Sequence, residues 1–288
     1  MRLFPPAWTD YGLIDSGNGR KLERFGPYTL IRPEPGATWH PTRHWDWERA
    51  DAQFNPTGSN QGAWQILKPM LPRWEIQFSR LRFWVAPTPF RHVGVFPEQA
   101  PQWKWLQEVI QSTAGGPSRA LSLFGYTGIA TLSMAEAGAN VAHVDSSKKA
   151  VQWARENAAL SGLEAFPIRW IVEDAMKFVQ REVRRGAKYE VIVLDPPPIG
   201  HGTRGESWLF ERDMPKLLEA CRKLLAERPL AVLITAYTAK TSPIHLRNML
   251  HEMIMPHHGQ LEFGDVALRD LGGHELPQAY FARWRTTS

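Results

Sequence analysis

Cysteine is nearly absent from this sequence, in which Cys221 is the only one among 288 residues. A single cysteine excludes an internal disulfide framework and any zinc site built from several cysteines. The sequence also lacks a run of the roughly 18 apolar residues that a membrane span requires. Its first residues, MRLFPPAWTD, do not have the basic segment and apolar segment of a secretory leader. We therefore expect a protein of a reducing compartment, the cytoplasm, without a membrane span.

A metal-ligand pattern is missing as well. Five histidines of the C-terminal third lie at irregular spacing among predicted turns: His201, His251, His257, His258 and His274. No set of further ligands accompanies them in the sequence, and solvated or loop histidines are the more common explanation of such a distribution. We expect no metal site.

Positive charge exceeds negative charge only modestly. The chain has 34 lysine and arginine residues against 29 aspartate and glutamate residues, which gives a formal net charge of +5 at pH 7. A basic surface attracts polyanions, and nucleic acid is the most common polyanionic partner. Because many enzymes of small molecules are basic too, the charge leaves both kinds of substrate open.

The region 1–95 differs in composition from the rest of the chain. Nine of the 13 tryptophans lie in the first 105 residues, and the turn sequences DSGNG (15–19) and PEPG (33–36) separate short alternating runs. This pattern predicts a small, mostly antiparallel β domain, which we consider a candidate for substrate recognition. Its tryptophans are suited to stacking on unpaired bases, but we favour a place in the core of the small domain.

Apolar strands and amphipathic helices alternate over the region 96–288. A turn is predicted at 115–118. Strands are predicted at 119–124, 140–144, 168–172, 189–194, 230–235, 260–267 and 279–284, and helices at 102–113, 128–137, 147–160, 175–185, 208–226 and 243–253. Such regular alternation is typical of an α/β fold in which helices cover both faces of a parallel sheet.

Residues that directly follow the strands are the candidates for ligand binding, because an open parallel sheet binds ligands beyond the carboxyl ends of its strands. The first strand is followed by Phe124, Gly125, Tyr126, Thr127 and Gly128. This glycine-bounded turn lets backbone amides and a helix N-terminus approach a ligand closely. The chain lacks the full G-x-G-x-x-G of dinucleotide-binding proteins, so we expect a smaller nucleoside ligand.

The second and third strands each end in an acid. Asp145 follows the second strand, where an acid can bind the ribose hydroxyls of a nucleoside, and Asp174 follows the third, where a carboxylate can accept a hydrogen bond from the adenine amine. We favour these two roles. Capping of the following helix is the alternative at both positions.

The fourth strand ends in Asp195-Pro196-Pro197-Pro198, the most specific signal in the chain. Proline cannot continue a central strand, so we expect a rigid extended loop whose carbonyl groups are free to accept hydrogen bonds from a substrate. Such rigidity suits a methyl transfer, which needs the acceptor, the carbon and the sulfur in line.

These segments resemble class I S-adenosylmethionine-dependent methyltransferases, and among them the large-subunit ribosomal RNA methyltransferases that include cytosine-C5 enzymes. The resemblance runs from about Leu81 to Leu225. It rests on FRHVGVFPEQ (90–99), LFGYTG (123–128), VDSS (144–147), ENA (156–158), EDA (173–175) and LDPP (194–197).

The resemblance implies a Rossmann-like sheet of seven strands, the last antiparallel, with S-adenosylmethionine over the first four strand ends. It implies RNA as the substrate. The hairpin that ends in Gln99 would reach the cofactor, and Ser146, Ala175 and Asp195 would join the glycine turn, Asp145 and Asp174 in binding it.

The chain departs from the cytosine-C5 enzymes at one position. Those enzymes typically carry a cysteine after the fifth strand, where this chain has Thr235-Ala236-Tyr237-Thr238, and Cys221 falls in a predicted helix. We therefore expect direct methyl transfer to a base nitrogen or another nucleophile, with Asp195, Pro196 and Pro197 positioning it.

Three other interpretations remain open. A methyltransferase of proteins or small molecules would share the same cofactor residues. A nucleotide-dependent oxidoreductase is disfavoured by the missing G-x-G-x-x-G, and a non-catalytic binding module by the intact motifs.

Overall fold

The structure is a computed structural model that describes residues 1–58, 61–113, 118–203, 205–238 and 240–287. Of the turn predicted at 115–118, residues 115–117 lie outside the described residues. The chain divides into two compact units: unit 1 comprises Met1–Leu3, Pro101–Val266 and Gln278–Ser288, and unit 2 comprises Phe4–Ala100 and Ala267–Pro277. The main boundary between the two units thus lies after Ala100, whereas the sequence predicts a boundary after residue 95. The segment 267–277, which the sequence leaves in the larger domain, falls in unit 2.

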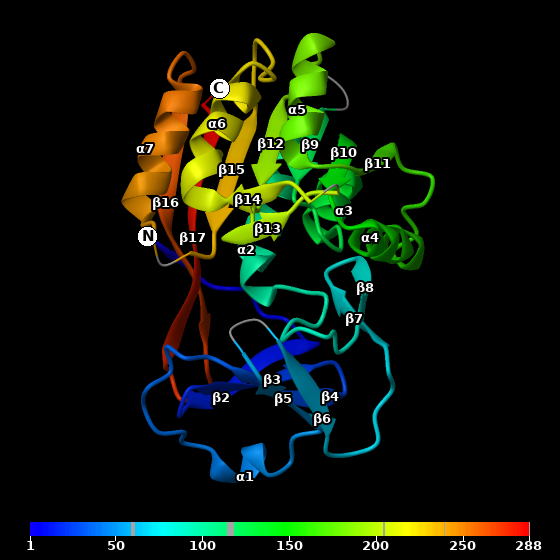
Figure 1. Ribbon diagram of the computed structural model, residues 1–288, viewed down its shortest axis with the longest axis vertical. Coiled ribbons are helices and arrows are strands. Elements are labelled where there is room, and N and C mark those ends of the chain that lie inside the picture. Colours follow the sequence, from blue (N-terminus) through cyan, green and yellow to red (C-terminus); the bar gives the residue numbers. More distant parts are fainter. Residues whose placement is uncertain (59–60, 114–117, 204, 239, 288) are drawn as a thin grey trace. The chain divides into compact units, whose positions relative to one another are not determined.

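Unit 1 is built on a sheet of eight strands in the order β1-β16-β17-β15-β12-β9-β10-β11 (Figure 1). The strands are β1 (Arg2–Leu3), β9 (Arg119–Leu123), β10 (Asn140–Asp145), β11 (Ile168–Val172), β12 (Val191–Leu194), β15 (Ala231–Ala236), β16 (Gly259–Arg269) and β17 (Glu275–Thr286). Five neighbouring strands, from β15 to β11, are parallel, and β17 runs antiparallel to β15. The predicted Rossmann-like sheet with an antiparallel last strand is therefore confirmed, and the two-residue β1 adds an eighth strand to the expected seven.

Helices cover both faces of this sheet. They are α2 (Ala100–Gln111), α3 (Ile129–Glu136), α4 (Lys148–Leu160), α5 (Ala175–Arg184), α6 (Phe210–Arg222) and α7 (Pro243–Ile254). Side chains alternate along β12: Ile192 and Leu194 pack in one core with α5, α6 and α7, whereas Val191 and Val193 pack in another with α2 and α3. Burial on both faces explains why these strands read as continuous apolar runs. In Figure 1, α5, α6 and α7 lie side by side on one face.

A short hairpin interrupts the segment between β12 and α6. Its strands are β13 (Ile199–His201) and β14 (Ser207–Leu209), which pair antiparallel. The sequence predicts an extended loop followed directly by a helix from residue 208, so this hairpin was missed and the helix begins two residues later, at Phe210. Three-residue strands have too few residues for a period-2 pattern to be recognised.

Unit 2 is mostly β, as the sequence predicts. A five-stranded sheet has the order β2-β3-β4-β5-β6, and β7 pairs with β8. The elements are β2 (Tyr11–Gly17), β3 (Arg20–Phe25), β4 (Tyr28–Pro33), α1 (His44–Trp47), β5 (Ala52–Pro56), β6 (Gly62–Ile66), β7 (Trp74–Phe78), β8 (Leu81–Val85) and the 3-10 helix η1 (Pro97–Gln99).

The tryptophans of unit 2 correct one expectation. Of the seven before residue 95, Trp74 is the only one that is fully buried, and Trp45 on α1 is 77% exposed. The others are partly exposed, and the indole N–H of Trp64, for example, donates a hydrogen bond to the backbone carbonyl of Thr88. A place in the core therefore describes Trp74 but not the group.

No helix in the described part of the chain is both long enough and apolar enough to cross a membrane. Within the same residues, no group of three or more His, Cys, Asp or Glu side chains is arranged to hold a metal ion.

Candidate functional site

The glycine turn after β9 has an unusual backbone. Phe124 and Tyr126 have positive φ angles of 57° and 49°, a conformation that costs free energy for residues other than glycine. Gly125 between them has no room for a side chain, because a Cβ there would lie 2.5 Å from Nδ1 of His143. Gly128, with φ of 85°, precedes the first turn of α3, and a Cβ there would lie 2.7 Å from Cβ of Ala154. Because His143 and Ala154 pack this closely against the turn, both positions require glycine.

Two buried polar side chains hold this turn from beneath. Asn157 of α4 donates a 2.9 Å hydrogen bond to the carbonyl oxygen of Thr127. Nδ1 of His143 lies 2.9 Å from the Thr131 hydroxyl, and burial lowers the pKa of His143 to about 3, so the imidazole is neutral. No role for His143 was predicted, and Asn157 appeared only within the segment ENA. A polar residue in the middle of a buried strand was the available signal for His143.

Asp145 lies at the carboxyl end of β10 and contacts the glycine turn directly. Its Oδ2 accepts a 2.9 Å hydrogen bond from the Tyr126 amide, and its Oδ1 accepts a 2.8 Å bond from the Ser147 amide. Burial raises the pKa of Asp145 above its ordinary value. The N-cap of α4 is Ser147, whose hydroxyl accepts from the Ala150 amide, and not Asp145. Each carboxylate oxygen keeps a second lone pair that could accept a ribose hydroxyl.

Asp174 is the N-cap of α5. Its Oδ1 accepts a 3.0 Å bond from the Lys177 amide, so the capping role that the sequence left open is present. The cap uses one carboxylate oxygen, which leaves Oδ2 for an adenine amine. Ala175 is buried directly behind it, and the Ser146 hydroxyl donates a 3.1 Å bond to the His201 carbonyl of the hairpin.

Asp195 follows β12, between the ends of β9 and β15. Its amide donates a 3.3 Å bond to the Leu123 carbonyl, and its carboxylate accepts a hydrogen bond from the Thr235 hydroxyl. Burial raises the pKa of Asp195 to about 6, against the opposing effect of that hydrogen bond. At neutral pH the group is therefore a carboxylate with a pKa close to that of an effective general base.

Two carbonyl groups of the proline loop, which the sequence predicts to be free, already accept hydrogen bonds within the chain. The indole of Trp208 donates a 2.8 Å bond to the Pro197 carbonyl, and the Phe210 amide donates a 3.0 Å bond to the Pro198 carbonyl. Both carbonyls are thus held by the chain itself, because the β13–β14 hairpin folds back onto the loop. The loop is fixed by these bonds as well as by proline.

Trp208 connects the proline loop to the glycine turn, a role that was not predicted. Besides the bond to Pro197, its ring packs on Phe124 of the glycine turn, with centroids 4.9 Å apart at 53°. The sequence pattern places it at the start of a helix, where an indole gives no sign of a partner 84 positions earlier in the chain.

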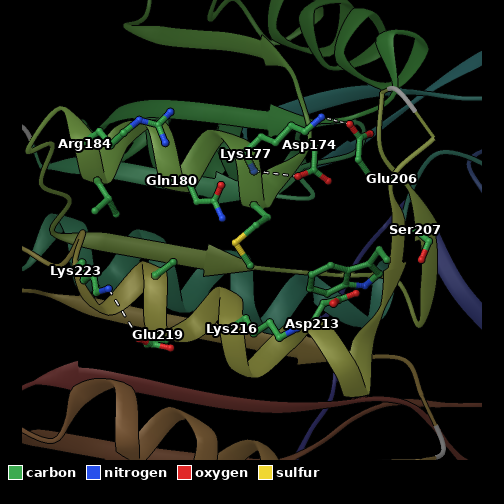
Figure 2. A pocket seen from close by; sticks show the side chains of 14 residues that line it. Asp174, Lys177, Gln180, Arg184, Glu206, Ser207, Asp213, Lys216, Glu219 and Lys223 are labelled. Atoms are coloured by element: carbon green, nitrogen blue, oxygen red, sulfur yellow. Dashed lines mark hydrogen bonds and ion pairs between the residues drawn. The ribbon is translucent and has the colours of Figure 1, made fainter.

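A groove of about 610 Å³ lies between α5 and α6 and adjoins this site, since Asp174 and Trp208 are among its lining residues. Figure 2 shows the charged side chains along it. The cations are Lys177, Arg184, Lys216 and Lys223, and the anions are Asp174, Glu206, Asp213 and Glu219. Lys177 pairs with Glu206, and Asp213 pairs with Arg212 outside the groove.

The strand-end residues of unit 1 fit a nucleoside cofactor. Gly125 and Gly128 leave two positions of the turn without a side chain. Asp145 is oriented by two amides, and Asp174 keeps one carboxylate oxygen outside its cap. Gln99 lies in unit 2, buried in the 3-10 helix, and its predicted contact with the cofactor stays a prediction.

Residues 52–244 match the family model described as S-adenosylmethionine-dependent methyltransferase. The chain belongs to this family. The methyltransferase accordingly uses S-adenosylmethionine, as the sequence predicts. A crystal structure of a SAM-dependent methyltransferase from Agrobacterium tumefaciens is similar over all of this chain and 94% of that one, with 41% identity and a TM-score of 0.95.

Two curated relatives are ribosomal RNA large subunit methyltransferases. The K enzyme of Neisseria meningitidis is 31% identical over 147 residues, which are 50% of this chain and 40% of the relative. The K/L enzyme of Shewanella frigidimarina is 37% identical over 108 residues, 37% of this chain and 15% of the relative. The methyltransferase thus spans less than half the length of these curated relatives.

Proposed function

We propose that this methyltransferase methylates RNA, with ribosomal RNA as the favoured substrate, by direct transfer to a base nitrogen. The names of the curated relatives support RNA, as does the net charge of +5. A ribosomal RNA substrate would place the activity in the cytoplasm.

The observation that carries the proposal is the place of Asp195. It lies at the end of β12, beside the glycine turn that follows β9, with a pKa of about 6. When bound at the strand ends, S-adenosylmethionine would supply a methyl group on a cationic sulfur, which would leave with the electron pair of the C–S bond. Asp195 would hold the acceptor nitrogen by its hydrogen and take that proton as the new bond forms.

The cofactor would be held by the strand-end residues. We assign the backbone of Phe124, Gly125, Tyr126, Thr127 and Gly128, the carboxylates of Asp145 and Asp174, and the flanking Ser146, Ala175 and Gln99 to this role. Asp195, Pro196 and Pro197 would face the acceptor. The bonds from Trp208 and Phe210 keep this loop in one conformation, which favours alignment of the acceptor.

The position of Cys221 supports direct transfer. Cytosine C5 becomes nucleophilic only after a thiolate adds to C6, and a reactive thiolate needs exposure and a lowered pKa. Cys221 is 0% exposed in the core between α6 and the sheet, and burial raises the pKa of its thiol. The end of β15 has Thr235, Ala236 and Tyr237 instead of a cysteine.

The decisive experiment is a methylation assay with purified protein and radiolabelled S-adenosylmethionine. Total RNA, total protein and small-molecule extracts from cells that lack the gene serve as separate acceptors. We expect label in RNA, and mass spectrometry of the nucleosides would then identify an N-methylated base. Label in protein or small molecules alone would contradict the RNA substrate and favour the alternative methyl acceptors.

A further inference from the structure

The carboxylate of Asp195 has a dedicated hydrogen-bond donor on the neighbouring strand. In the sheet, Leu194 of β12 is paired with Ile234 of β15, so that the next residues, Asp195 and Thr235, lie beside each other at the carboxyl ends of the two strands. The Thr235 hydroxyl donates to Oδ1 of Asp195. Thr235 is 1% exposed, so water does not compete for this hydroxyl.

The hydrogen bond from Thr235 restricts the orientation of the Asp195 carboxylate. A carboxylate can rotate about the bond that joins it to Cβ, and a donor fixed in the sheet limits this rotation by holding one of the two oxygens. With Oδ1 held, Oδ2 is the oxygen that remains for an acceptor. Thr235 also has no room to move, because residues 231–236 of β15 are all buried.

We propose that Thr235 is a positioning residue of the methyl transfer, which orients the Asp195 carboxylate toward the hydrogen of the acceptor nitrogen. The proposal deepens the proposed function and rests on the role given there to Asp195. Thr235 touches neither substrate nor cofactor in it. Its hydroxyl acts only through Asp195.

The hydrogen bond from Thr235 also affects the pKa of Asp195. Burial raises the pKa of Asp195, and the Thr235 bond is the cause that opposes it. The charged groups on the adjacent elements have partners of their own: Glu211 of α6 accepts the Thr238 hydroxyl, and Asp145 of β10 accepts two amides. The ring of Trp208 adds no charge. Loss of the Thr235 hydroxyl should therefore raise the pKa of Asp195 further.

The test compares Thr235→Val with Thr235→Ser. Valine keeps the shape and removes the donor, whereas serine keeps the donor. Thr238→Val is the matched control, because it removes a neighbouring hydroxyl that bonds to Glu211 instead. We expect the acid limb of kcat/KM to move up by about one pH unit in Thr235→Val, so that kcat/KM on that limb is about tenfold lower at a given pH. In Thr235→Ser and Thr238→Val the limb should stay in place.

A second readout needs neither substrate nor cofactor. The pH dependence of unfolding, compared between each variant and the same variant with Asp195→Asn, reports the pKa of Asp195 in the free protein. We expect this pKa to rise in Thr235→Val only. An unchanged pKa together with an unmoved acid limb, or a loss of activity equal at all pH values, would overturn the positioning role. A labelled substrate other than RNA would contradict the proposed function while leaving this readout intact.

Discussion

The imidazole of His143 fills the space where a side chain of Gly125 would stand. A Cβ on Gly125 would lie 2.5 Å from Nδ1 of His143, and His143 is itself held by Thr131. The buried histidine of β10 thus sets the residue type allowed in the turn after β9.

Gly125→Ala should therefore destabilise unit 1 and weaken cofactor binding. Overpacking of this kind costs about 1–3 kcal/mol, because His143 cannot move without leaving Thr131. Thermal unfolding and calorimetry with S-adenosylmethionine would measure both effects, and Gly58→Ala, at an open position, is the control. Adding His143→Ala should recover part of the affinity. If Gly125→Ala is as stable as wild type and binds the cofactor as tightly, this account is contradicted.

Asp145→Ala should lower the affinity for S-adenosylmethionine by about 1–3 kcal/mol, since the ribose hydroxyls lose a charged acceptor. The same change frees the Tyr126 amide, which adds mobility to the turn. Calorimetry of a folded variant measures the effect, with the exposed Glu164→Ala as control. Unchanged affinity would assign Asp145 to supporting the turn alone.

Asp195→Asn should make the protein more stable at alkaline pH and slow its turnover. In the folded protein the pKa of Asp195 is about 6, against its ordinary value of 3.8. The free energy of unfolding therefore falls as the pH rises between these two values, and the full destabilisation by the buried carboxylate is reached above about pH 6. Asparagine has no charge to bury. We expect the variant to be about 1–3 kcal/mol more stable at pH 8, equally stable below about pH 4, and about 100-fold slower or worse.

Cofactor affinity of Asp195→Asn should change little if the loop has the acceptor-positioning role that we propose for it. Equal losses in cofactor affinity and in turnover would show that Asp195 belongs to the cofactor site instead. Wild-type kcat/KM should fall as pH drops through about 6, when the carboxylate becomes protonated.

The groove between α5 and α6 offers a test of the RNA substrate. Arg184→Gln combined with Lys216→Gln removes one cation from each helix. If both contact phosphates, the slope of log affinity against log salt for single-stranded RNA should decrease by about 0.7 for each contact. Lys104→Gln, on α2, is the control. A slope unchanged from wild type would place the RNA elsewhere.

Cys221→Ala should keep full activity on the true substrate. The thiol lies on the buried face of α6, so its loss leaves only a small cavity and costs about 1 kcal/mol of stability. RNA that contains 5-fluorocytosine should form no covalent complex with the wild type. A trapped complex that disappears in Cys221→Ala would restore a thiolate mechanism.

Local sequence patterns predicted the elements of unit 1 closely. The strand at 168–172 has the predicted bounds, and the helices α4 and α5 each differ from prediction by one residue at one end. Helix and strand periodicity depend on residues a few positions apart, which the sequence displays directly. The residues at the strand ends were found for the same reason, because parallel strands bring their carboxyl ends to one edge.

Contacts between distant residues were decided by the tertiary structure alone. Thr235 and Asp195 are 40 positions apart and meet because β12 and β15 are neighbours in a fixed register. Trp208 reaches Pro197 and Phe124 through a hairpin too short to leave a pattern. The sequence by itself determined the α/β sheet, the cofactor and the candidate acids; strand order and register decided which side chains hold those acids and the proline loop in place.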